Sequence, residues 1–151
     1  MRMIACAAFA AALLTSVPVL AKGSDMSPAD LSALKSYSLS MDKITAMQSA
    51  MDEAQKSGMG QKMRGTGDDA KSLAEMEARF KAMPAAMAIF AKHGLTAHDA
   101  VVMPFALMDA GMCVMYPSAA PKLADRVSPA QIAFYKQHKG ELDKMKWLNG
   151  G

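Results

Sequence analysis

Residues 97–115 read AHDAVVMPFALMDAGMCVM and form the most apolar segment of the chain beyond its first 21 residues. Thr96 and Asp99 stand at the spacing of a capping box, which predicts a helix that begins at Ala97. Tyr116–Pro117 predicts its end, because the residue before a proline is disfavoured in the helical conformation. Apolar residues cover all sides of this helix. We therefore expect it to lie at the centre of a helical bundle, buried by neighbours on every side.

A membrane span is the alternative for a helix that is apolar all round. Residues 100–117 are at the short end of the ~20 residues needed to cross a bilayer. The segment also contains Pro104, Asp109 and Gly111, and a carboxylate is costly inside lipid. The sequence therefore favours a buried core helix, and we expect no transmembrane segment in the mature chain.

The rest of the chain carries helix start and stop signals and almost no strand pattern. A serine followed three residues later by an acidic residue or glutamine predicts helix starts at Ser27, Ser72 and Ser128. Breaks are expected at residues 38–40 (SLS), at Pro84 and after His93. These signals predict an all-α fold, a small bundle of four or five helices around the apolar central helix.

Residues 57–69 interrupt this helical pattern. The segment is polar and contains four glycines, at positions 58, 60, 65 and 67. Glycine-rich polar segments behave as flexible connections. We therefore expect residues 57–69 to form a flexible surface loop.

The first 21 residues have the pattern of an export signal. Arg2 supplies the positive charge, residues 4–14 form an apolar stretch, and residues 19–21 (VLA) suit a signal peptidase. Cleavage after Ala21 is expected to leave residues 22–148 as a single helical bundle domain and residues 149–151 as a tail. We therefore expect the protein to be exported, to the periplasm or out of the cell.

Composition and motifs exclude some classes of function. The 151 residues carry 17 Lys and Arg against 14 Asp and Glu, a formal net charge of +3, which does not favour nucleic acid as a partner. The chain has no His-Glu-x-x-His and no Gly-x-Ser-x-Gly motif. We therefore expect a non-catalytic binding or interaction protein, whose partner is a protein or an apolar ligand in the cell envelope.

Four segments of the chain are distinctive enough to compare with other proteins: YSLSMDK (37–43), HGLT (93–96), ALMDA (106–110) and VSPAQIAFY (127–135). They resemble segments of an uncharacterised family of exported, all-helical bacterial proteins. The resemblance implies export and a helical fold. Because that family has no assigned activity, the resemblance implies no site residues.

Sulfur chemistry suggests a metal site on the central helix. Once Cys6 leaves with the signal, Cys113 is the remaining cysteine, and it falls within eight residues of Met108, Met112 and Met115. Thioethers and a thiolate favour copper in its reduced state. The three methionines share one helical face, but Cys113 points well away from them, so a second helix would have to contribute. Methionine also fills irregular gaps in cores, which is the competing interpretation.

A b-type haem in the bundle core is a further alternative, because small helical bundles hold haem with a histidine and a methionine. His138 lies on the apolar stripe of the last helix, between Phe134 and Leu142, and is expected to be buried. Asp109 is the carboxylate of the apolar helix, so we expect it to have a raised pKa or an Arg79 or Arg126 partner. His138 and Asp109 are thus candidate cofactor-binding residues. We expect no cofactor, with copper or haem as the alternative.

Overall fold

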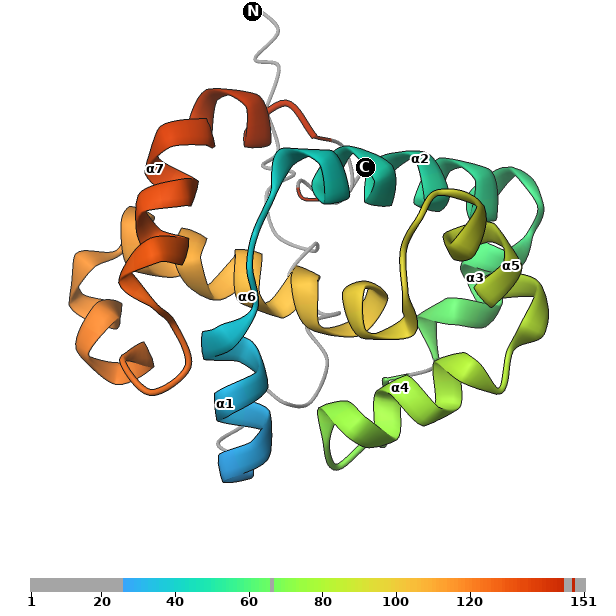
Figure 1. Ribbon diagram of the computed structural model, residues 1–151, viewed down its shortest axis with the longest axis horizontal. Coiled ribbons are helices and arrows are strands. Elements are labelled where there is room, and N and C mark those ends of the chain that lie inside the picture. The colour runs from blue at the N-terminus through green and yellow to red at the C-terminus, as the bar shows by residue number, and fades with distance from the viewer. Residues whose placement is uncertain (1–25, 66, 146–147, 149–151) are drawn as a thin grey trace, which may run out of the picture.

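The computed structural model describes residues 26–65, 67–145 and 148, and no strand occurs among them. The expected all-α fold is confirmed (Figure 1). The elements are α1 (Pro28–Ser36), α2 (Met41–Lys56), α3 (Met59–Arg64), α4 (Leu73–Lys81), α5 (Pro84–Lys92), α6 (Ala97–Met115), the 3-10 helix η2 (Pro117–Leu123) and α7 (Pro129–Leu142). The expected export signal (1–21) and tail (149–151) lie outside the described residues.

The described part of the chain has eight helices, not the four or five expected. Two of the eight, α3 and η2, lie in segments that were expected to be loops, and the breaks expected at residues 38–40 and at Pro84 both divide the chain. Ser40 accepts a hydrogen bond from the Lys43 amide and starts α2, so α1 and α2 are separate helices. Pro84 likewise starts α5, because a proline is tolerated in the first turn of a helix but not in its interior.

The expected loop at residues 57–69 is wrong for Met59–Arg64, which form α3. Gly58 adopts a φ of 75°, the left-handed conformation that ends α2 and redirects the chain. Met59 and Met63 then lie on one face of α3 and pack against the core. The glycines therefore separate two helices, and the two methionines between them supply the apolar contact.

The loop expected between α6 and α7 is also partly helical. Residues Pro117–Leu123 form η2, which packs against α6. A 3-10 helix closes with short-range hydrogen bonds and is used in short pieces, and prolines occupy the first and fifth of its seven positions here. The repeated alanines of this segment gave no apolar stripe from which to predict it.

Helix α6 crosses the middle of the molecule and contacts α1, α4, α5, α7 and η2. Among the described helices, only α6 is long and apolar enough, by length and composition alone, to cross a membrane. Core helices of soluble proteins pass the same test, and 61% of this apolar window is buried inside the protein. Its buried residues belong to one continuous hydrophobic cluster.

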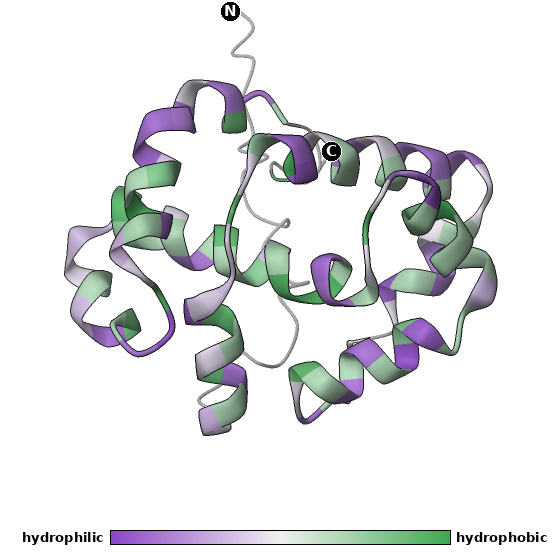
Figure 2. Cartoon of the chain, in the orientation of Figure 1, coloured by the Kyte–Doolittle hydropathy of each residue, from purple (hydrophilic) through white to green (hydrophobic). Residues whose placement is uncertain are grey.

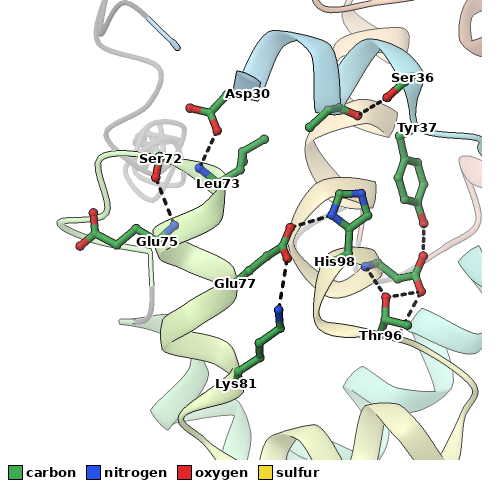
Figure 3. Close-up of polar contacts among 12 residues, drawn as sticks. Asp30, Ser36, Tyr37, Ser72, Leu73, Glu75, Glu77, Lys81, Thr96 and His98 are labelled. Carbon is green, nitrogen blue, oxygen red and sulfur yellow. Dashed lines mark hydrogen bonds and ion pairs between the residues drawn. The ribbon is translucent and has the colours of Figure 1, made fainter. Parts of the chain in front are cut away.

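Three buried polar side chains link helices that are far apart in the sequence, and each stands at the third position of its own helix. Asp30 of α1 accepts a hydrogen bond from the Leu73 amide at the start of α4, at 3.0 Å (Figure 3). Asp99 of α6 accepts hydrogen bonds from the Tyr37 hydroxyl at 2.7 Å and from the Lys43 ammonium at 2.6 Å. Asp99 also completes the capping box of its own helix, and the Asp30 carboxylate also accepts from the hydroxyl of Ser27, the N-cap of α1.

Gln131 of α7 is the third of these side chains. Its Nε2 donates to the carbonyls of Leu34 at 2.7 Å and Tyr37 at 2.9 Å, at the end of α1. Its Oε1 accepts from the Ser128 amide and completes the capping box of α7. Carbonyl groups at the end of a helix lack a full set of partners within that helix. Here the first turn of α7 supplies a hydrogen-bond donor to two such carbonyls at the end of α1.

Helices α6 and α7 approach each other closely at Gly111. A Cβ atom on Gly111 would lie 2.9 Å from Cε2 of the Tyr135 ring, which is itself buried. No side chain heavier than hydrogen fits at this point without a shift of the ring. The glycine therefore sets the distance between the central helix and α7.

We predict that Gly111→Ala lowers the free energy of unfolding by about 1–2 kcal/mol. The forced displacement of Tyr135 outweighs the gain that alanine brings within a helix. Chemical denaturation of the two proteins measures the difference.

Gly140→Ala in α7 is the matched control, because a Cβ at Gly140 meets nothing within 4 Å. It is expected to raise stability by about 0.5–1 kcal/mol. If Gly111→Ala stabilises the protein as much as Gly140→Ala does, the close approach of α6 and α7 is not tight.

Candidate functional site

The methionine face of α6, formed by Met108, Met112 and Met115, is exposed. The exposed fractions of these residues are 41%, 37% and 50%, and that of Tyr116, which follows them, is 56%. Full burial of α6 was expected, so this expectation is wrong for one side of its C-terminal half. Figure 2 shows that hydrophobic residues run along α6, including this end. The neighbouring elements cover the other sides of the helix and leave this one open.

Cys113 does not belong to this face. It is 7% exposed and lies at the edge of a groove of about 280 Å³, together with Lys35, Leu123 and Ile132. Burial raises the pKa of its thiol, and the charge of Asp109 adds to this. Cys113 is therefore held as a neutral thiol on another side of α6 from the three methionines.

Asp109 is paired with Arg126, one of the two partners considered from the sequence. The two carboxylate oxygens accept from Nε of Arg126 at 2.6 Å and from its Nη2 at 2.8 Å. The side chain of Asp109 is 3% exposed and that of Arg126 is 21% exposed. Burial raises the pKa of Asp109, while the hydrogen bond from Arg126 acts in the opposite direction. Arg79 instead pairs with Glu75 of its own helix.

His138 is only half-buried, which corrects the expectation that it lies in the core. Its side chain is 23% exposed, and Nδ1 lies 3.2 Å from a carboxylate oxygen of Glu141. Its ring is 4.6 Å from the ring of Phe134, centroid to centroid. His138 lies on the same face of α7 as the buried Gln131, Tyr135 and Leu142. Its ring is nevertheless partly exposed, beside Phe134 and Glu141.

The Tyr37–Asp99 contact is a polar site that the sequence did not predict. Burial raises the pKa of the Tyr37 hydroxyl, and its hydrogen bond to Asp99 raises it further. Burial also opposes ionisation of Asp99, but hydrogen bonds from Lys43, Tyr37 and Thr96 outweigh it and hold its pKa well below the usual range. The capping box at Thr96 was the available signal for Asp99. Its partners come from 56 and 62 residues away, and no local pattern shows them.

We predict that Arg126→Met lowers the free energy of unfolding by about 3–5 kcal/mol at pH 7, because it leaves the Asp109 carboxylate buried without a counter-charge. The loss is expected to shrink as the pH falls, because a carboxyl with a raised pKa in the folded state takes up a proton there before it does in the unfolded chain. Denaturation at pH 7 and at pH 5 measures both effects.

The double variant Asp109→Leu with Arg126→Met is the control. Replacing both partners by apolar side chains is expected to recover most of the stability, because no unpaired charge stays buried. A double variant as unstable as Arg126→Met alone would contradict this account of the pair.

Within residues 26–65, 67–145 and 148, no three His, Cys, Asp or Glu side chains lie close enough to hold a metal ion. The methionine face carries thioether sulfurs, which are not among these ligand types. No family model matches the chain, and comparison with curated proteins and with solved structures found no match. The resemblance to exported helical proteins that was drawn from the sequence stays a prediction.

Proposed function

We propose that this protein is an exported, non-catalytic binding protein that offers the methionine face of α6 to an apolar protein partner in the cell envelope. One observation carries the proposal. Of the five large hydrophobic residues that are exposed in the described part of the chain, four lie between Met108 and Tyr116. Exposed apolar side chains gathered in one place are typical of interaction surfaces.

The choice of methionine supports a protein partner. Methionine is unbranched and polarizable, so a surface of methionines adapts to partners of different shape. Met108, Met112 and Met115 follow one another at steps of four and three along α6. This spacing gives a straight apolar strip about two turns long, which suits the apolar side of a helix from the partner.

The side chains that would serve catalysis have structural partners, which supports a non-catalytic role. Both oxygens of Asp109 accept from Arg126. Cys113 has a raised pKa and is therefore a poor nucleophile. Asp99 is held by Tyr37 and Lys43. Export is proposed from the N-terminal pattern alone.

The proposal predicts a specific photo-crosslink. A benzophenone amino acid in place of Met112, in the protein expressed and exported in its own host, is expected to give one discrete protein adduct on irradiation. The same amino acid in place of Lys136, which is exposed on α7, is expected to give none. Gel shift and mass spectrometry of the adduct are the readout.

Two surface variants sharpen the test. Met108→Gln with Met115→Gln keeps helix-forming residues but removes the apolar strip, and is expected to weaken the adduct about tenfold, equivalent to ~1.4 kcal/mol of binding. Equal crosslinking from positions 112 and 136 would show that the methionine face is not the interface. An adduct yield that is unchanged in the Met108→Gln, Met115→Gln variant would show the same.

A further inference from the structure

We propose that Met108, Met112 and Met115 bind one copper(I) ion through their thioether sulfurs. These residues occupy one side of α6, because at about 100° per residue they fall within an arc of roughly 60°. Met112 is the central residue, with Met108 four positions before it and Met115 three positions after it. Side chains at these spacings are direct neighbours on a helix surface, with Cβ atoms ~5–6 Å apart.

Packing inside the protein does not account for these three methionines. Other methionines of the chain do pack in or against the core, among them Met47, Met76, Met103, Met59 and Met63. Met108, Met112 and Met115 lie outside this cluster and are exposed. These side chains are therefore open to a metal ion from solution. Met51 of α2 is also exposed, but no other exposed methionine stands within four positions of it along α2.

The chemistry of the donors selects the metal. Thioether sulfur is a soft, neutral ligand, and soft sulfur ligands favour copper(I) over harder divalent ions. The acidic residue nearest in sequence, Asp109, is engaged by Arg126, and Cys113 is buried on another side. The donor set is thus three neutral sulfurs. Because a thioether has no proton to lose, binding is expected to depend little on pH between 5 and 8.

This inference does not rest on the proposed protein partner, although both use the same face. The two are separated by substitution with leucine. Leucine keeps the apolar character, the approximate volume and the helix propensity of methionine, but it has no sulfur. A leucine face is therefore expected to retain an apolar partner and to lose copper(I).

The experiment is an anaerobic titration of the exported protein with copper(I) against a chromophoric chelator. We expect one ion per chain. The triple variant Met108→Leu, Met112→Leu, Met115→Leu is expected to bind at least tenfold more weakly. Among single variants, Met112→Leu is expected to lose most, because Met112 neighbours both other sulfurs. Circular dichroism and denaturation confirm that each variant is folded.

Two controls locate the site. Met51→Leu removes an exposed but isolated thioether, and Cys113→Ser removes the thiol; both are expected to bind copper(I) as the unaltered protein does. Methionine-methyl NMR gives a second readout, in which the signals of residues 108, 112 and 115 shift on copper(I) addition and that of residue 51 does not. Unchanged affinity in the triple leucine variant, loss of binding in Cys113→Ser, or no binding by the unaltered protein would overturn the proposal.

Discussion

The end of α1 and the turn that follows it are held by polar side chains from two other helices. Asp99 of α6 accepts a hydrogen bond from the Tyr37 hydroxyl, and Gln131 of α7 donates to the Tyr37 carbonyl. At the other end of α1, Asp30 accepts from the amide of Leu73 in α4. All three side chains are buried, and a buried polar group without a partner costs about 1–3 kcal/mol. Each of these buried groups finds its hydrogen-bond partner on another helix. These hydrogen bonds therefore fix the arrangement of α1, α4, α6 and α7.

This constraint positions the methionine face. Asp99 anchors the first turn of α6, the Asp109–Arg126 pair ties its middle to the segment before α7, and Gly111 allows α7 to approach closely. These contacts all lie on the buried sides of α6. The remaining side is held in one orientation by the rest of the structure and contributes nothing to the core, so its side chains are free to take part in binding.

Local signals predicted the starts of the helices, because a cap lies within four residues of the helix it starts. Ser27, Ser72, Thr96 and Ser128 each cap a helix as the sequence indicates. The partners of Asp30 and Gln131 were not predictable, because they lie 43 and 97 residues away. Helix α3 was not predicted, because the glycines in and around it favour a loop more strongly than the four-residue spacing of Met59 and Met63 favours a helix. Apolar residues on all sides identified α6 as the central helix, but a helix that is apolar all round does not show which side its neighbours leave open.

Buried residues at the third position of a helix do more than cap it in this protein. Ser128→Ala removes only the local cap of α7 and is expected to cost about 1 kcal/mol of unfolding free energy. Gln131→Leu also removes the Gln131 donor from the Tyr37 carbonyl and from the Leu34 carbonyl, which keeps only the Tyr37 amide, and is expected to cost about 2–4 kcal/mol. The measurement is the difference between these two variants in equilibrium denaturation. A markedly larger loss for Gln131→Leu is the predicted result, and equal losses would contradict the account.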